Sequence, residues 1–342
     1  MSREMDQLTA YLLDAFGLGR DAGPARLTPV ARGAEGRVSL LEVGDRRYAV
    51  KQPFAVNAGF TDLATAEAVA RRKAAHLEAF ARAGIAVPEA LPDRAGRFLA
   101  AVPEELGGGL VRLTTWVDGA APRSDFVPGL HAEQLGTLVG RLHAAAPDSD
   151  DPIGPWYRTV PPAQTWADLV SRGHGQPWLA ELEPRLGEIE VLGAVVRDAP
   201  EPVPPFVVGH RDLHPDNVLL ADDDRLVPVD WEDIGPVLPD RELAKVLAQW
   251  HVDGDEVDAS AVRRTVQAYR AAGGTGAVRG PESFTMLLSG ELNFLAEQVG
   301  KTLDPALDDD HRAHASAEVH ECLLWLPTAR VLGRVLELAS DR

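Results

Sequence analysis

The sequence predicts an α+β protein with a small, sheet-rich N-terminal lobe and a larger, mainly helical C-terminal lobe. Segments 37–43 and 46–51 have the residue pattern of two strands joined by a tight Gly44-Asp45 turn, and segments 97–102 and 110–117 also have strand character. After Asp118-Gly119 most of the chain has the apolar periodicity of helices. We therefore expect an N-terminal lobe at residues 1–118 and a C-terminal lobe at residues 119–342, with ligands bound where the two meet.

Helical spacing first occurs at residues 4–16, where Leu8, Leu12 and Phe16 share one face. Residues 62–83 contain no Gly or Pro and are followed by Gly84, which predicts one long helix with a glycine C-cap in the N-terminal lobe. Further helices are expected at 131–145, 164–172, 178–197, 240–251, 257–272, 282–301 and 310–339. Strand-like segments at 206–208, 218–220 and 226–229 interrupt this helical part around a polar loop.

The charge distribution argues against several kinds of partner. Residues 1–119 hold 15 basic and 15 acidic residues, whereas residues 120–342 hold 19 and 37, so the net charge of −18 belongs to the second part. A nucleic acid or an anionic membrane would need a basic surface, so neither is expected as a partner. The acidic part is either a solvated surface or a field that attracts a cationic substrate, and charge alone favours the first.

Composition also indicates the compartment. The polar N-terminus has no apolar export segment, no run of about 18 apolar residues is present, and Cys322 is the only cysteine. These features predict a cytoplasmic protein without disulfides. Only four of the 34 basic residues are lysines: Lys51, Lys73, Lys245 and Lys301.

The strongest functional signal is the loop His210-Arg-Asp-Leu-His-Pro-Asp-Asn217, followed thirteen residues later by Asp230. Phosphoryl transfer from ATP needs a carboxylate that accepts or orients the proton of the attacking hydroxyl, and oxygen ligands for Mg²⁺. Asp212 can serve as the base, Asn217 can offer a carbonyl oxygen to the metal, and Asp230 can bridge metals on the phosphates. The spacing from Asp212 to Asn217 is that of a kinase catalytic loop.

This loop and the following Val229-Asp-Trp-Glu232 resemble the aminoglycoside phosphotransferase and choline kinase family, the small-molecule branch of the protein-kinase-like fold. The resemblance implies a bilobal fold, ATP and Mg²⁺ as cofactors, and a small-molecule hydroxyl as acceptor. Residues 135–143 are similar to the family's Leu-Gly helix that ends in His. Residues 239–244 are similar to the segment that braces the catalytic loop, with Glu242 in place of the usual Asp.

The same resemblance places the nucleotide in the N-terminal lobe. Lys51 ends a strand, as the phosphate-binding lysine of kinases does, and Gly33 and Gly36 would allow a backbone loop to approach the phosphates. The segment 113–119 resembles the family's hinge, so the backbones of Thr115 and Val117 would contact adenine. These hinge positions can equally be an ordinary strand end.

A kinase lysine is normally held by a glutamate on the next helix, and here the sequence departs from the family. Arg72-Lys73 stands where Arg-Glu is usual. Glu67 and Glu78 remain as candidates, and we favour Glu67 because it lies sixteen residues after Lys51. His143 and His210 are expected to support the structure rather than to act as bases.

Several functions stay open. The first is a kinase of an antibiotic, of the aminoglycoside type or another cationic kind, that confers resistance or serves biosynthesis. The second is a metabolic kinase of choline, homoserine, a sugar or an amino sugar. A third, of another class, is a nucleotide-binding protein without catalysis. The acceptor, the choice between ATP and GTP and the oligomeric state do not follow from the sequence, although Glu291, Glu297, Glu318 and Glu321 are candidates for acceptor binding.

Overall fold

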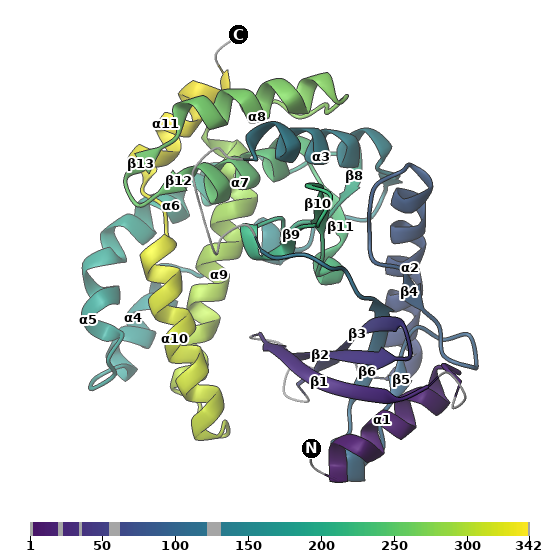
Figure 1. The fold of residues 1–342 in the computed structure, drawn as a ribbon. Coiled ribbons are helices and arrows are strands. Elements are labelled where there is room, and N and C mark those ends of the chain that lie inside the picture. The colour runs from purple at the N-terminus through teal and green to yellow at the C-terminus, as the bar shows by residue number, and fades with distance from the viewer. Residues whose placement is uncertain (1–2, 20–22, 34–35, 55–61, 122–130, 341–342) are drawn as a thin grey trace. The chain divides into compact units, whose positions relative to one another are not determined.

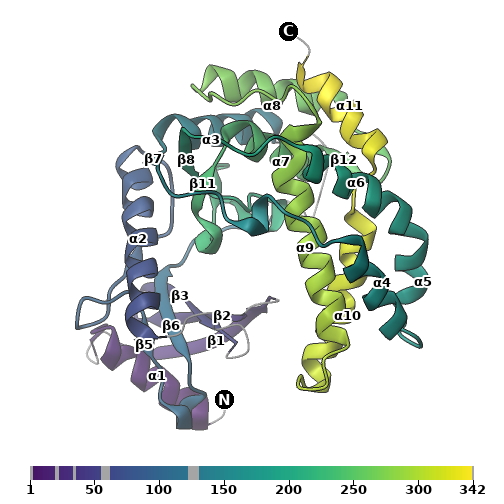
Figure 2. The same cartoon turned by 180° about the vertical axis from the view of Figure 1, so that it is seen from behind.

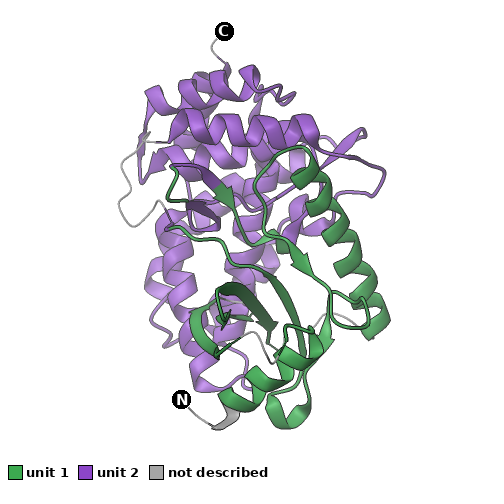
Figure 3. Cartoon of the chain, turned by 45° about the vertical axis from the view of Figure 1, so that its right-hand side comes forward, with its two compact units in different colours: residues 1–119, 221–223, 227–232 green, residues 120–220, 224–226, 233–342 purple. Residues whose placement is uncertain are grey.

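The computed structural model describes residues 3–19, 23–33, 36–54, 62–121 and 131–340, and it divides the chain into two compact units (Figure 3). The first unit comprises residues 1–119, 221–223 and 227–232. The second comprises residues 120–220, 224–226 and 233–342. The segment that carries Asp230 therefore groups with the N-terminal sheet, although its position in the chain had assigned it to the C-terminal lobe.

The first unit is built on a six-stranded antiparallel sheet with the order β1-β2-β3-β6-β4, in which β5 also pairs with β6 (Figure 1). The predicted hairpin is confirmed, and Gly44, with a φ of 57°, forms its turn. The strands are β1 (Ala25–Arg32), β2 (Gly36–Val43), β3 (Arg46–Pro53), β4 (Ala90–Leu91), β5 (Ala100–Ala101) and β6 (Leu110–Thr115).

The edge strand β1 was not predicted. It contains Pro29, which cannot donate a ladder hydrogen bond and lowers the strand signal of the sequence. The strand tolerates this residue because it lies at the sheet edge and its register shifts between Pro29 and Ala31.

Two helices complete the first unit. Helix α1 (Arg3–Ala15) contributes Leu12 to a core that also contains Leu41 and Leu113, each at most 1% exposed. Helix α2 (Leu63–Arg82) is the long helix that was predicted, and the Asp62 side chain caps it by accepting the Thr65 N–H at 2.8 Å. It ends two residues before Gly84, which has a φ of 78°.

The second unit is mainly helical (Figure 2), so the predicted α+β fold is confirmed. Its α-helices are α3 (Ala132–Ala145), α4 (Ala163–Arg172), α5 (Leu179–Leu182), α6 (Leu186–Asp198), α7 (Pro239–His251), α8 (Ala259–Ala271), α9 (Thr285–Thr302), α10 (Asp309–Trp325) and α11 (Ala329–Ser340). Short 3₁₀ helices are η4 (Pro155–Tyr157), η5 (Glu183–Arg185), η6 (Pro215–Asn217) and η8 (Pro281–Phe284), with η2 (Glu104–Leu106) in the first unit and η7 (Trp231–Asp233) at the division between the units.

Two long helices expected from the sequence are interrupted. The segment 310–339 forms α10 and α11, separated around Pro327, and 178–197 forms α5, η5 and α6 with Pro184 inside η5. Proline lacks the N–H of a helix interior and disfavours helical backbone in the residue before it. The missing N–H accounts for the change from α5 to η5 at Pro184. The restriction on the preceding residue accounts for the end of α10, because Leu326 before Pro327 is extended, with a φ of −61° and a ψ of 114°.

Short strands support the loop with the functional motif. The strands β7 (Asp148–Ser149), β8 (Phe206–Gly209) and β11 (Gly235–Val237) form a sheet with the order β11-β8-β7, and the loop follows β8 directly. The other strands are β9 (Val218–Leu220), β10 (Leu226–Pro228), β12 (Val252–Asp253) and β13 (Glu256–Val257). Within the described ranges, no helix is both long and apolar enough to cross a membrane.

Helices α3 and α8 pack at unusually short distance. A Cβ added to Gly136 would lie 2.2 Å from the carbonyl oxygen of Thr265, and one added to Gly140 would lie 2.5 Å from that of Tyr269. Such distances are below any van der Waals contact, so both positions require glycine. This packing fixes the end of α3, which carries His143.

Candidate active site

The loop after β8 places Asp212 and Asn217 in direct contact in the second unit. Asn217 donates from Nδ2 to the Asp212 carboxylate oxygen Oδ2 at 2.8 Å and to its backbone carbonyl at 3.1 Å. Both partners are acceptors, so the amide nitrogen faces Asp212 and Oδ1 faces elsewhere. The remaining oxygen of Asn217 is therefore the atom that could bind a metal.

Two cationic groups lie beside the Asp212 carboxylate. Lys245 of α7 donates to Oδ1 at 2.9 Å and to the Arg211 carbonyl at 2.8 Å, and His214 Nε2 lies 3.5 Å from Oδ2. Burial opposes ionisation of Asp212, but Lys245 and His214 together hold its pKa well below its usual range. Burial likewise disfavours the imidazolium, but the carboxylates of Asp212 and Asp216 raise the pKa of His214 to about 9.

The loop backbone is held in an unusual conformation. Arg211 has a φ of 72°, in the left-handed region that non-glycine residues seldom adopt. Its N–H donates to the Glu242 carboxylate, its side chain donates to the Asp233 carbonyl, and its guanidinium lies 4.4 Å from the centre of the Tyr157 ring. These three contacts hold the strained residue that precedes Asp212.

Glu242 is the centre of a buried hydrogen-bonded chain that supports this loop. Its Oε2 lies 2.7 Å from Nε2 of His143, whose Nδ1 lies 2.7 Å from the hydroxyl of Tyr269. Burial raises the pKa of Glu242, but the contacts with His143 and the Arg211 N–H outweigh it and lower the pKa overall. The brace expected at Glu242 is therefore present, and His143 is the hydrogen-bonded core histidine that was predicted.

The first unit contains the predicted nucleotide-binding lysine and one of the two predicted metal-binding residues. Lys51 on β3 lies 2.5 Å from Oδ1 of Asp230 and 3.5 Å from Oε1 of Glu232. Asp230 has a φ of 57°, which a short polar side chain tolerates better than most. The predicted nucleotide lysine and the predicted metal carboxylate are thus neighbours.

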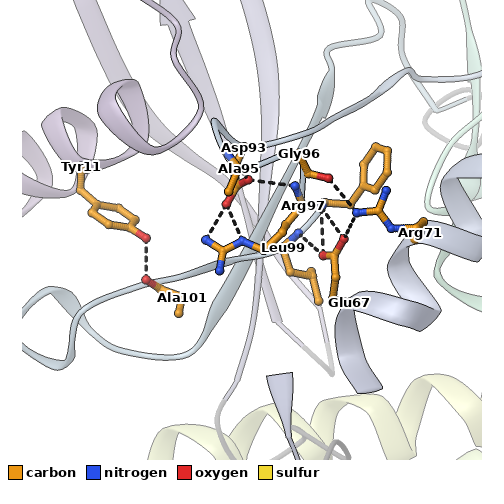
Figure 4. A network of polar contacts seen from close by, with 10 residues as sticks. Tyr11, Glu67, Arg71, Asp93, Ala95, Gly96, Arg97, Leu99 and Ala101 are labelled. Atoms are coloured by element: carbon orange, nitrogen blue, oxygen red, sulfur yellow. Dashed lines mark hydrogen bonds and ion pairs between the residues drawn. The ribbon is translucent and has the colours of Figure 1, made fainter. Parts of the chain in front are cut away.

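The predicted pair between Lys51 and Glu67 is wrong. Glu67 on α2 accepts the backbone N–H of Phe98 at 2.9 Å and that of Leu99 at 3.1 Å, and it pairs with Arg71 at 2.9 Å (Figure 4). Its side chain points to the loop before β5. There its carboxylate accepts hydrogen bonds from two backbone amides that would otherwise lack acceptors. Among the described residues, no ion pair joins Glu67 to Lys51.

The predicted glycine loop is only partly described. The Gly33 N–H donates to the Gly36 carbonyl at 3.0 Å, and a Cβ on Gly36 would lie 2.6 Å from the carbonyl oxygen of Gln52. Gly36 is thus required for close pairing of β2 with β3. Ala34 and Glu35 lie outside the described residues.

The predicted hinge begins at the end of β6. The N–H of Thr115 donates to the Glu89 carbonyl at 2.9 Å, so it is not available to adenine. Trp116 donates its N–H to the Arg47 carbonyl at 3.0 Å, whereas no hydrogen bond of the Val117 backbone occurs within the described part of the chain. Val117 is therefore the better placed of the two predicted positions.

Sequence reasoning missed Lys245, His214, Glu232, Lys73 and Arg112 as site residues. Lysine is rare in this chain, and three of its four lysines contact the carboxylates at Asp212, Asp230 or Glu232. The scarcity of lysine was the available signal for these residues, but it did not show which carboxylate each lysine contacts.

The acidic candidates for acceptor binding have different surroundings. Burial raises the pKa of Glu291 on α9, and Gln249 donates to it at 3.1 Å. Glu297 pairs with Lys301 at 2.6 Å, and Glu318 lies 3.4 Å from His314. Glu291 is the candidate that interacts electrostatically with Lys245 and Asp212.

A divalent cation fits the donor chemistry. Asn217 Oδ1 in the second unit and the Asp230 carboxylate in the first unit are each a hard oxygen donor of the kind that Mg²⁺ prefers. The described residues contain no cluster of three His, Cys, Asp or Glu side chains arranged to hold a metal ion by themselves. Each donor therefore suits a metal whose remaining ligands are phosphate oxygens and water.

Comparisons with known proteins agree with this chemistry. A family model described as the phosphotransferase enzyme family matches residues 26–281. No match was found among curated protein sequences.

Solved structures share the fold over nearly the whole chain. A spectinomycin phosphotransferase in complex with ADP and spectinomycin has a TM-score of 0.66 and 12% identity, with 98% of each chain covered. An amicoumacin kinase in complex with AMP-PNP and Ca²⁺ has a TM-score of 0.60 and 16% identity, with 96% of each chain covered. A microcompartment-associated aminopropanol kinase has a TM-score of 0.58 and 15% identity, with 98% of this chain and 99% of the other covered. The predicted protein-kinase-like fold is thereby confirmed.

Proposed function

The chain belongs to the phosphotransferase enzyme family, and we propose that it transfers the γ-phosphoryl group of ATP to a hydroxyl of a small molecule with Asp212 as the residue that receives the hydroxyl. The observation that carries this proposal is that Asp212 contacts Asn217 of the same loop and Lys245 of α7. A carboxylate held from both sides presents its remaining lone pairs in a defined direction. That property suits a group that must orient a nucleophile.

The low pKa of Asp212 defines its role further. A carboxylate stabilised by Lys245 and His214 is a weak base, so it orients the hydroxyl first and takes its proton late. By then the bond from phosphorus to the ADP oxygen is largely broken, the new oxygen–phosphorus bond is forming, and the hydroxyl proton has become acidic. This order fits the loose transition state of phosphoryl transfer, in which positioning and electrostatics dominate.

We propose that the first unit binds the nucleotide. Lys51 would contact the phosphates, Gly33 and Gly36 would border them, and the Val117 backbone with the Thr115 carbonyl would contact adenine. Asn217 and Asp230 would hold Mg²⁺, which neutralises charge on the phosphates when it is bound. The relatives solved with ADP or with AMP-PNP and Ca²⁺ support a nucleotide and a divalent metal. Glu67 is not proposed to contact the nucleotide, because its carboxylate serves the Phe98 and Leu99 amides.

We propose an antibiotic as the acceptor, with a cationic group and a role in resistance or biosynthesis. Two of the structural relatives are named for antibiotics, spectinomycin and amicoumacin. The surplus of acidic residues after residue 119 and the position of Glu291 near Asp212 support a positively charged acceptor. The second candidate is a metabolic kinase of an amino alcohol, which the likeness to an aminopropanol kinase favours.

The test is a screen for ADP release from Mg-ATP with hydroxyl-bearing antibiotics, amino alcohols and sugars as acceptors. We expect at least one acceptor to raise ADP release above the acceptor-free rate, and Asp212→Asn to remove that increase. Binding of Mg-ADP without turnover of any acceptor would favour a catalytically silent nucleotide-binding protein instead.

A further inference from the structure

Helix α2 carries a cation where a kinase usually carries the carboxylate that holds its lysine. Lys73 donates to the backbone carbonyl of Glu232, and its Nζ lies 3.8 Å from the Glu232 oxygen Oε2. The charge from the helix is thus reversed, and the carboxylate comes from the segment after β10 instead. All the contacts involved lie within the first unit.

The Glu232 carboxylate is shared by three cations from three different elements. Lys51 of β3 lies 3.5 Å from Oε1, Arg112 of β6 pairs with the same oxygen, and Lys73 of α2 approaches the other. The four side chains are between 20% and 25% exposed, so water screens these charges only in part.

The register of the sheet explains why a carboxylate is needed here. Lys51 and Arg112 are directly opposite each other on the antiparallel strands β3 and β6. Like charges at such positions repel. Glu232 contacts both and offsets that repulsion, so without it the Lys51 ammonium would move away from Arg112.

We propose that Glu232 is the positioning residue for Lys51, and that Lys73 and Arg112 hold Glu232 in place for this task. The inference rests on the proposed function, because it assigns Lys51 to the phosphates of the nucleotide. Asp230 also contacts Lys51, but Asp230 is the carboxylate proposed to bind the metal. Glu232 is therefore the carboxylate proposed to stay paired with Lys51 when the metal is bound. The five side chains together retain one positive charge, since three cations face two carboxylates, and this charge favours a polyphosphate.

The direction of one substitution separates positioning from simple electrostatics. If Glu232 were only a negative charge near a polyanion, Glu232→Gln would strengthen the binding of ADP. If it positions Lys51, Glu232→Gln weakens binding by about tenfold, the effect of losing one charge-assisted contact. Glu105→Gln is the matched control, because Glu105 lies in η2, is exposed and makes no ion pair in the described structure.

The experiment is a double-mutant cycle on the dissociation constant of Mg-ADP, without an acceptor. It uses the full chain, Glu232→Gln, Lys51→Gln and the double variant, with thermal unfolding as a check that each is folded. We expect Glu232→Gln to have no further effect once Lys51 is replaced, and Lys73→Gln to weaken binding. Unchanged or tighter binding of Mg-ADP in Glu232→Gln would overturn the inference. An equal loss of affinity with and without the Lys51→Gln substitution would also overturn it, because Glu232 would then act on the metal or the nucleotide directly. Failure of the unaltered chain to bind Mg-ADP would instead reject the proposed function.

Discussion

Lys245 Nζ lies 2.9 Å from Oδ1 of Asp212, so the carboxylate proposed to receive the hydroxyl is ion-paired with a lysine whose side chain is only 8% exposed. The pair links α7 to the loop after β8. It keeps Asp212 ionised and fixes the direction of its carboxylate plane.

Replacing Lys245 should therefore move the acid limit of activity. In Lys245→Met the attraction that lowers the pKa of Asp212 is lost, so that pKa rises. Asp212 must be ionised to act, hence the acid limb of the kcat/KM profile should shift to higher pH, and kcat should fall. Lys301→Met is the control, because Lys301 pairs with Glu297 on the same helix. An unshifted acid limb would show that Lys245 does not set the ionisation of Asp212.

Asp212→Asn should retain nucleotide binding and lower kcat by about 10²–10⁴, the usual range for general-base catalysis. The substitution keeps the size of the side chain and removes its charge. Steady-state kinetics and a Mg-ADP titration measure the two effects separately. Turnover close to that of the unaltered chain would remove Asp212 from its role.

Activity should require a divalent cation and be lost in EDTA. Asp230→Asn should abolish turnover, because it removes the charged donor while asparagine still tolerates the left-handed backbone at this position. Asp222→Ala, on an exposed turn, should be unaffected. Full ADP release in EDTA would contradict the assignment as a kinase.

Glu67→Ala should destabilise the protein by about 1–3 kcal/mol, because the N–H groups of Phe98 and Leu99 lose their acceptor. The KM for ATP should change little, since Glu67 does not contact Lys51. Glu78→Ala on the exposed side of the same helix should change neither quantity. Denaturant unfolding and ATP kinetics test this, and a raised KM with normal stability would restore the kinase-type pair.

If the acidic second part of the chain attracts a cationic acceptor, kcat/KM for that acceptor should fall as salt rises. At about 0.15 M ionic strength the Debye length is about 8 Å, so long-range attraction is largely screened. Because steering acts on encounter, kcat should change less. A neutral analogue with the same hydroxyl provides the control. If the acceptor with the highest kcat/KM is neutral or anionic, the charge argument fails, and the acidic residues serve only to keep the protein in solution.

The parts of the site that are contiguous in sequence could be predicted, and the parts that depend on long-range pairing could not. The spacing between Asp212 and Asn217 determines their contact within one loop. The partner of Lys51 was misassigned because several carboxylates had plausible spacing, and spacing on α2 does not show that the Glu67 side chain is directed to the Phe98 and Leu99 amides.

The fold shows the same limit. The long helix α2 and the hairpin β2–β3 were predicted because each has a continuous local pattern. The pairing of β1 with β2 overrides the unfavourable signal of Pro29, which a local pattern cannot anticipate. The break between α10 and α11 could have been inferred from Pro327, which disfavours helical backbone in the residue before it.

Substitutions at Gly136 or Gly140, the glycines of α3 that face α8, should disturb the active site although neither residue lies in it. An ordinary Gly136→Ala or Gly140→Ala change would push α3 away from α8, and His143 at the end of α3 would pull on Glu242 and the Arg211 amide. Such a lesion would be recorded in a genetic screen as a loss of catalysis, although neither position touches a substrate. Variants selected for restored activity should then regain the glycine itself, because an exchange of Ala268 for glycine would leave the carbonyl oxygen of Thr265 only 2.2 Å from the new Cβ.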